Sequence, residues 1–315
     1  MASESAIATE GLQQAQTAPP RSWLRRLLVF GVPAAYLVAL TIVTLSWGLP
    51  VARDQLFFWL VLGIAAFSVP AWRSWGGLAL EWLPFFALLV AYDRLRGAVA
   101  TDQPGQAHVD AQLAFDKALG GGEVPTVWLQ QHLWHAGHPR WYDYGVWAVY
   151  MTHFFAVWVT AAVIWRMARE RFRRYAVTAV ALSLSAFATY WAFPAQPPWM
   201  AGESIKMASV DRIVPEVWGQ LGVGTAQSLY ENRDFVNPVA AMPSLHAAFP
   251  LMLLLFFWSA GRWVRLALGL YTLAMAFALV YGGEHFVIDI LAGWAMALAV
   301  HAVVSAISRS RRRTS

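Results

Sequence analysis

The stretch FVIDILAGWAMALAVHAVVSA, residues 286–306, is an apolar run long enough to span a bilayer as a helix. It carries one acidic residue, Asp289, about one turn from its start. A charged aspartate inside the hydrocarbon layer costs about 2.5–3.5 kcal/mol, so it requires a partner or a function. His285 precedes it by four residues, a spacing that places both side chains on one helical face. We therefore expect the carboxylate to orient the imidazole, with a polar pair that only joins two helices as the alternative.

A second histidine stands at the entrance of another apolar run. The sequence AMPSLH at 241–246 precedes that run, and its proline and serine are typical of a helix start. The unpaired amides of a helix start bind anions, and Ser244 adds a hydroxyl donor. Each motif stands at the start of an apolar run, and one further run, 264–281, lies between those two runs, so His246 and His285 are expected on the same side of a membrane. Together these groups favour phosphoryl transfer, in which one imidazole attacks phosphorus and the other protonates the leaving oxygen.

The composition of the whole chain is typical of a membrane protein. Hydrophobic residues make up 58% and charged residues 13%, against about 25% charged in soluble domains. The chain has no cysteine, which excludes disulfides and thiolate chemistry. Apolar runs recur at 26–47, 55–71, 77–92, 144–165, 175–193, 246–260, 264–281 and 286–306. We expect an all-α, polytopic membrane helix bundle of about eight transmembrane helices, or about six if 55–92 forms one re-entrant hairpin.

The arginines indicate the orientation of the chain. They gather in segments that an eight-helix arrangement with both termini inside places in the cytoplasm, most densely in RMARERFRR at 166–174. The net charge of +5 is then explained by membrane orientation rather than by nucleic acid binding. We expect a disordered cytoplasmic tail at 1–22, a single transmembrane catalytic domain at 23–308 and a basic cytoplasmic tail at 309–315.

Two long connections, 93–143 and 194–245, are expected on the outer side. Both exceed the ~12–15 residues of an ordinary loop, so we expect both to be folded and functional. In the first, the apolar positions of 125–134 recur at helical spacing. This segment suits an interfacial helix anchored by Trp128 and Trp134.

The motifs at the two entrances resemble those of a known family. Residues 243–246, Pro-Ser-Leu-His, are similar to the second motif, Pro-Ser-Gly-His, of the type 2 phosphatidic acid phosphatase superfamily. Residues 285–289 are similar to the His-x-x-x-Asp of its third motif. The variant AMPSLH, together with YGGEH at 281–285, is closer to the inositol phosphorylceramide synthase-like branch. The resemblance covers the catalytic half of the chain, about 190–300.

This resemblance implies a role for each motif residue. His285 is the nucleophile that forms a phosphohistidine, Asp289 orients it, and His246 is the general acid. Neither a metal nor another cofactor is implied. The chain departs from the family pattern at Leu279, where the third motif has an arginine, and at FPAQPPW, residues 193–199, in place of the first motif. Other cations are therefore expected to meet the phosphate charge.

Substrate binding is expected to involve Ser244, Tyr281, His153 and two cations. The outer basic residues that can supply the cations are Arg94, Arg96, Arg140, Lys206, Arg212 and Arg233. We prefer Arg96 and Arg212, with interfacial snorkelling as the alternative for either. His153 lies within an apolar run, where a polar residue is a functional candidate, and a hydrogen bond across helices is its alternative role.

Three classes of function fit these residues. The preferred class is an integral membrane lipid phosphatase or phosphotransferase. It acts on a phospholipid or polyprenyl/lipid phosphate through a phosphohistidine intermediate, and its acceptor is water or, in a headgroup transferase, an alcohol. The second class is a metal-dependent membrane hydrolase liganded by His246, His285, Asp289 and His153. The third is a lipid transporter or structural membrane protein. We expect the plasma (inner) membrane, with the active site on the extracytoplasmic side and a membrane lipid as partner.

Overall fold

A computed structural model of the chain describes residues 26–47, 53–69, 81–83, 87, 91, 107–204, 206–221 and 239–314. Within this part every regular element is helical, and extended backbone pairs only at isolated bridges. The prediction of an all-α protein is therefore confirmed. The expected tail at 1–22 and most of the expected span at 77–92 lie outside the described residues. The chain divides into two compact units, Met1–Leu78 and Ala79–Ser315.

The first unit contains a pair of apolar helices. The π-helical turn η1 (Leu27–Gly31) leads into α3 (Val32–Trp47), which packs against α4 (Arg53–Ser68). The Tyr36 hydroxyl of α3 donates a hydrogen bond to a backbone carbonyl of α4 over 2.9 Å. A Cβ atom at Gly63 would collide with that hydroxyl. The two helices therefore approach through a small residue and one polar contact, as apolar helices do in lipid.

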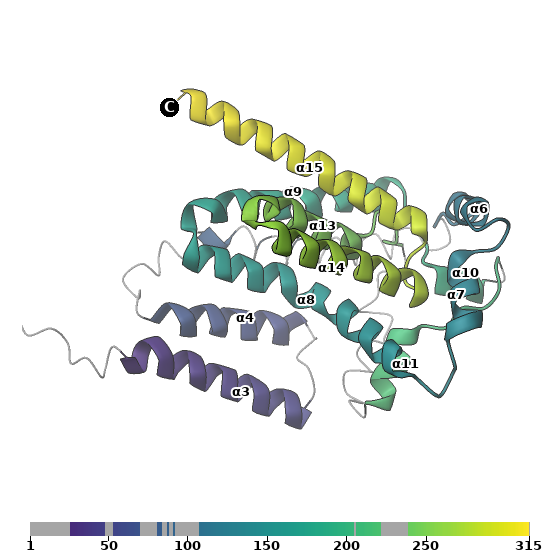
Figure 1. The fold of residues 1–315 in the computed structure, drawn as a ribbon, viewed down its shortest axis with the longest axis horizontal. Coiled ribbons are helices and arrows are strands. Elements are labelled where there is room, and N and C mark those ends of the chain that lie inside the picture. The colour runs from purple at the N-terminus through teal and green to yellow at the C-terminus, as the bar shows by residue number, and fades with distance from the viewer. Residues whose placement is uncertain are drawn as a thin grey trace, which may run out of the picture. The chain divides into compact units, whose positions relative to one another are not determined.

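The second unit is built around a helix bundle. Its main helices are α8 (Trp141–Met167), α9 (Arg169–Ala192), the shorter α13 (Leu245–Phe256), α14 (Arg262–Tyr281) and α15 (Val287–Thr314). The helix α13 packs against α14 and α15 and also contacts α8 and α9 (Figure 1). Large apolar side chains fill the interior, among them the fully buried Leu182, Met252 and Met275. Burial of this apolar surface between the helices fixes the places at which α13 and α15 begin.

Five helices of the described part are long and apolar enough to cross a membrane. They are Leu27–Thr44, Trp141–Met167, Arg169–Ala192, Arg262–Tyr281 and Val287–Ser310. The helix α13 is apolar but has only 12 residues before it gives way to the 3-10 turn η3 (Trp258–Ala260). A multi-pass membrane protein is thus supported, whereas the exact count of eight spans stays a prediction.

Four shorter helices form a cap at the end of the bundle where α13 and α15 begin (Figure 1). The cap comprises α6 (Asp110–Leu119), α7 (Pro125–Leu133), α10 (Pro198–Glu203) and α11 (Ile213–Gln220). The helix expected at 125–134 is present as α7, with a proline at its first position. Leu113, Val127 and Phe286 belong to one buried apolar cluster that joins the cap to the start of α15. Where they are described, both long connections are therefore folded.

Three extended segments link the cap to the entrance of α13. Ala195 forms isolated parallel bridges with His108 on one side and Ala240 on the other. The His108 N–H donates to the Pro194 carbonyl over 2.7 Å, and the Ala241 N–H donates to the Ala195 carbonyl over 3.0 Å. These backbone bonds set the positions from which α6, α10 and α13 start.

The entrances of α13 and α15 are in direct backbone contact. The Ser244 N–H donates to the carbonyl oxygen of Asp289 over 2.9 Å. One turn further along α15, Gly293 faces the Ser244 backbone, and a Cβ atom there would collide with the Ser244 carbonyl oxygen. A residue larger than glycine would push the two helix starts apart.

We predict that Gly293→Ala destabilises the protein and lowers its activity, because overpacking a close contact costs about 1–3 kcal/mol. The measurement is the midpoint of thermal unfolding in detergent. Gly269→Ala in α14 is the matched control, since a Cβ atom there meets nothing within 4 Å. Equal midpoints for the two variants would contradict the requirement for close backbone approach.

Candidate active site

His285 lies in the turn that connects α14 to α15. Its Nδ1 atom is 3.5 Å from Oδ2 of Asp289, and both side chains are buried. The expectation that both residues share a helical face is wrong, because α15 begins at Val287, after the histidine. The turn instead brings the ring back over the first turn of the helix. Gly283 permits this path, since its φ of 77° belongs to the left-handed region that favours glycine.

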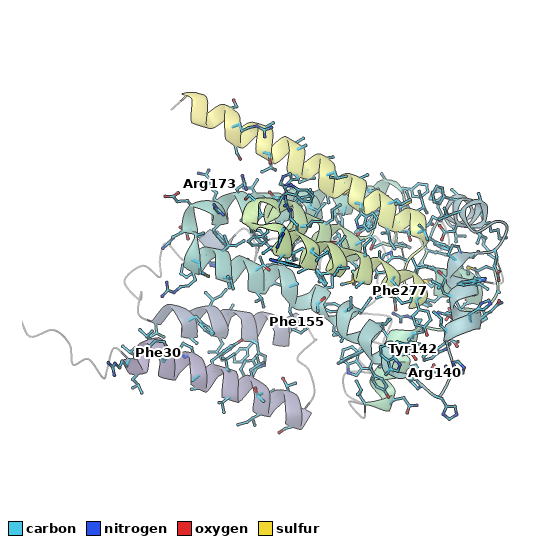
Figure 2. All side chains as sticks on the ribbon, viewed as in Figure 1. Phe30, Arg140, Tyr142, Phe155, Arg173 and Phe277 are labelled. Carbon is cyan, nitrogen blue, oxygen red and sulfur yellow. The ribbon has the colours of Figure 1, made fainter. Side chains whose placement is uncertain are left out.

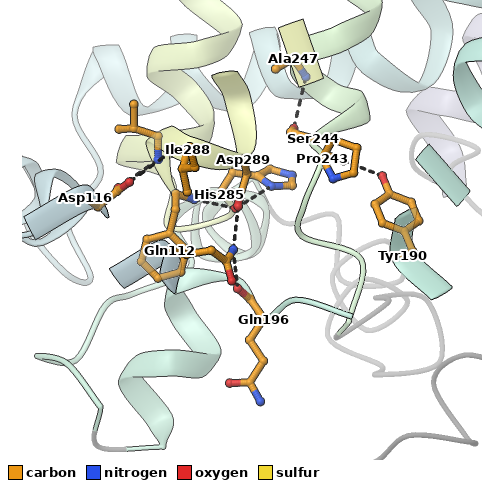
Figure 3. A network of polar contacts seen from close by, with 12 residues as sticks. Gln112, Asp116, Tyr190, Gln196, Pro243, Ser244, Ala247, His285, Ile288 and Asp289 are labelled. Atoms are coloured by element: carbon orange, nitrogen blue, oxygen red, sulfur yellow. Dashed lines mark hydrogen bonds and ion pairs between the residues drawn. The ribbon is translucent and has the colours of Figure 1, made fainter. Parts of the chain in front are cut away.

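The carboxylate of Asp289 is completely buried at the start of α15. Its Oδ2 atom accepts the Phe286 N–H over 2.9 Å, and its Oδ1 atom accepts the side-chain amide of Gln112 over 2.6 Å (Figure 3). His285 completes the surroundings on the Oδ2 side. Each carboxylate oxygen therefore has a donor, as a buried carboxylate requires.

His246 is in the first turn of α13 and faces His285. The centroids of the two imidazole rings are 5.6 Å apart. The Nε2 atom of His246 is buried and has no hydrogen-bond partner within the described part of the chain. The Ser244 hydroxyl caps α13 by accepting the Ala247 N–H over 3.3 Å. It retains its own proton to donate to a ligand.

A third histidine belongs to the same cluster. His153, from the middle of α8, stacks on His246 with ring centroids 3.7 Å apart. Tyr150, one turn earlier on α8, also stacks on His246, at 4.9 Å. The structure thus brings His153 to the catalytic candidates and adds Tyr150, which the sequence analysis missed. The only sequence signal for Tyr150 is its i, i+3 spacing from His153.

Arg212 approaches the site from the start of α11. Its guanidinium lies 4.6 Å from the Trp199 ring centroid and pairs with Glu284 at 3.1 Å, next to His285. The neighbouring Asp211 instead accepts the indole N–H of Trp134 over 2.8 Å. The Arg212 and Glu284 side chains are only 16% and 8% exposed, so the ion pair is a largely desolvated part of the site.

Two of the other outer basic residues are described, and both have partners outside the two motifs. Arg94, Arg96 and Arg233 are outside the described residues. Lys206 pairs with Asp110 at 3.1 Å on the surface of the cap. The Arg140 guanidinium contacts the His135 ring at 2.8 Å. Of the two preferred cations, only Arg212 lies among the described residues, where it pairs with Glu284, the residue before His285.

Tyr281 is directed toward α8. Its hydroxyl donates to Oδ1 of Asp143 over 2.6 Å, and both residues are buried. Its backbone carbonyl accepts the side-chain amide of Gln130 over 2.8 Å. These contacts join α14 to α8 and to the cap, and a role of Tyr281 in substrate binding stays a prediction.

The sequence analysis missed two polar residues of α6, Gln112 and Asp116. The Asp116 carboxylate accepts the Val287 N–H over 2.9 Å and the Ile288 N–H over 3.3 Å, so it caps α15 from another helix (Figure 3). Gln112 donates to Asp289, as described above. Neither residue belongs to a motif, and polar residues in a helix of an outer loop normally indicate a solvated face.

The histidines are not arranged as metal ligands. Across the described ranges, no group of three His, Asp or Glu side chains has a geometry that could hold a metal ion. The four side chains considered as ligands of a metal-dependent hydrolase, His246, His285, Asp289 and His153, therefore do not form a recognisable metal site.

Comparison with known proteins agrees with the two motifs. Residues 113–303 match the family model described as the PAP2 superfamily, and the chain belongs to this family of membrane lipid phosphatases and phosphotransferases. The predicted family is thus confirmed. A curated relative, the phosphoinositol dihydroceramide synthase of Bacteroides thetaiotaomicron, is 26% identical over 70% of this chain and 74% of its own. No solved structure matches the chain.

The cap contains a carboxyl group whose titration can be tested. Burial raises the pKa of Asp116 from 3.8 to about 6; the Val287 and Ile288 N–H groups oppose this shift, and the charge of Asp289 adds to it. Because its pKa is higher in the folded than in the unfolded chain, protonation of Asp116 favours the folded state. This contribution to stability is complete below about pH 4 and is lost as the pH rises through about 6.

We predict that the unfolding midpoint of the wild type, relative to Asp116→Asn, rises as the pH falls from 7 to 5. The measurement is a series of thermal unfolding curves in detergent at fixed ionic strength. The control is Asp110→Asn, an exposed position on the same helix, for which the difference stays nearly constant. A wild-type advantage that does not change with pH would contradict the prediction.

Proposed function

We propose that this protein transfers a phosphoryl group, alone or with its headgroup, from a membrane lipid through a phosphohistidine on His285. The observation that supports this most strongly is the meeting of His246 and His285, 5.6 Å apart, at the joined entrances of α13 and α15. Asp289 is buried beside Nδ1 of His285 and leaves Nε2 as the attacking nitrogen.

The reaction has two steps. In the first, the lone pair of His285 attacks phosphorus, the bond from phosphorus to the lipid oxygen breaks, and His246 gives its proton to that oxygen. In the second, water or an alcohol loses a proton to His246 and attacks the phosphohistidine, and the phosphorus–nitrogen bond breaks. His246 returns to its protonated form, and no metal or other cofactor takes part in the proposed steps.

The phosphate is held by groups at the same helix entrances. The Ser244 hydroxyl and the first amides of α13 supply donors suited to an anion. Arg212 is the proposed source of positive charge; its guanidinium is held by Trp199 and by Glu284, the residue before His285. Arg96 remains a proposed second cation, and His153 a proposed contact through its position next to His246.

The site is proposed to face the extracytoplasmic side of the plasma (inner) membrane. Figure 2 shows Arg173, at the arginine-rich junction of α8 and α9, at the end of the bundle opposite to Arg140 and Tyr142 in the cap region. Arginine-rich connections tend to stay in the cytoplasm. This placement puts the histidines, which lie toward the cap, on the outer side.

Headgroup transfer to an alcohol is the alternative to hydrolysis. The relative from Bacteroides thetaiotaomicron is named as a synthase of phosphoinositol dihydroceramide, and this name favours an alcohol acceptor. Both reactions share the first step at His285. They differ only in the molecule that attacks the phosphohistidine.

We predict that His285→Ala lowers turnover by about 10³-fold or more, because the nucleophile is lost. The measurement is phosphate release from a panel of lipid phosphates, diphosphates and phosphodiesters, with EDTA present and with or without polyol acceptors. The control is His138→Ala, an exposed histidine after α7, which retains wild-type turnover. Full turnover of His285→Ala would contradict the proposal, and loss of wild-type turnover in EDTA would favour a metal-dependent hydrolase.

We predict that His246→Ala slows lipid substrates by about 10²–10⁴-fold but slows an aryl phosphate much less. A lipid alkoxide needs a proton as it leaves, whereas an aryl oxide leaves without one. The measurement is the ratio of kcat values for the two substrates in wild type and variant. An equal loss for both would show that His246 is not the general acid.

A further inference from the structure

The inner face of α6 carries two buried polar side chains. Gln112 and Asp116 are four residues apart, so they lie on one face of the helix, and they are 1% and 0% exposed. Asp116 caps α15 through the Val287 and Ile288 N–H groups, whereas Gln112 reaches the carboxylate of the next residue, Asp289. This face of α6 therefore makes two separate polar contacts with the start of α15, one with its backbone and one with a side chain.

Gln112 acts on one oxygen of that carboxylate only. Its Nε2 atom donates to Oδ1 of Asp289 over 2.6 Å and lies 3.4 Å from the Gln196 carbonyl oxygen. The other oxygen, Oδ2, accepts the Phe286 N–H and faces His285. Because separate partners hold the two oxygens, the carboxylate cannot rotate, and Oδ2 stays directed at the imidazole (Figure 3).

Only one end of the Gln112 side-chain amide has a partner. The Oε1 atom of Gln112 is buried and has no hydrogen-bond partner among the residues that the structure describes. Burying an unpaired amide oxygen costs free energy, whereas removing the whole amide would leave Oδ1 of the buried Asp289 carboxylate without a donor. What the glutamine adds is its donor to Asp289.

The helix that carries Gln112 is itself firmly placed. Leu113, the next residue, packs in the apolar cluster that contains Phe286, and His108 pairs with the 194–196 segment just before α6. Gln112 therefore projects from a braced helix, which allows it to fix the orientation of another group.

We propose that Gln112 is a positioning residue for the transfer reaction, which sets the Asp289 carboxylate so that it holds His285 in the orientation for attack. The inference rests on the proposed function and assigns a role to the cap, which lies outside the two motifs. Gln112 acts through Asp289 and does not touch the substrate.

The test is Gln112→Met, which keeps the length of the side chain and removes the donor. We expect kcat to fall about 10- to 100-fold, the effect of losing a hydrogen bond to a charged group. We expect KM to change less than about 2-fold and the unfolding midpoint to fall, because Oδ1 of the buried Asp289 carboxylate loses its donor. The same substitution in an Asp289→Ala background should cause no further loss, because the two residues act as one unit.

Two further variants complete the experiment. Gln112→Glu keeps the shape of the side chain and, when ionised, removes the donor. We expect it to lower kcat at least as much as Gln112→Met does. It replaces the methionine variant as the test if that variant fails to fold. Asp110→Asn, at the exposed start of α6, is the control and keeps the wild-type kcat. Wild-type kcat in Gln112→Met or Gln112→Glu would overturn the inference, as would a kcat loss that persists fully without Asp289.

The two proposals fail in different ways. If His285→Ala is inactive and Gln112→Met is as fast as the wild type, only the role of Gln112 is overturned. If His285→Ala retains turnover in the same assay, the phosphohistidine proposal itself is overturned, and with it the inference that rests on it.

Discussion

The fully buried carboxylate of Asp289 is the constraint on which the site depends. An ionised carboxylate at the start of an apolar helix is too costly to keep without donors. The chain supplies two donors, the Phe286 N–H just before the helix and the Gln112 amide in the cap, and the ring of His285 lies 3.5 Å from Oδ2. Satisfying this charge therefore requires the cap to close over the end of the bundle. The same contacts that lower the cost of burial also orient the proposed nucleophile.

Backbone contacts unite the two motifs, which lie far apart in the sequence. The Ser244 N–H bonds to the Asp289 carbonyl, and Gly293 lets the two helix starts come together. The Tyr190 hydroxyl of α9 donates to the Pro243 carbonyl over 2.8 Å and holds the approach to α13 (Figure 3). Since helix ends and backbone bonds set the positions of both imidazoles, the site is built on rigid elements rather than on free loops.

The cation proposed to bind the phosphate comes from a different segment of the chain than in the family motif. At position 279, where the family motif has an arginine, Leu279 is fully buried in the bundle interior, a place unsuited to a charged side chain. The cation that we propose instead is Arg212, which from the start of α11 pairs with Glu284, the residue before His285. In this proposal the cap contributes a cation as well as a support for Asp289. This is a physical reason for two long connections to be folded in a membrane protein.

The sequence by itself determined the helical class, the helix at 125–134, the family and the residues of the two motifs, because apolar periodicity and motif spacing are local properties. Only the tertiary structure decided that His285 precedes α15, that His153 stacks on His246, and that Gln112 and Asp116 of α6 reach the start of α15. These contacts join residues far apart in the chain. They depend on how the helices and the cap pack together, and this packing cannot be predicted from the residues next to each position in the sequence.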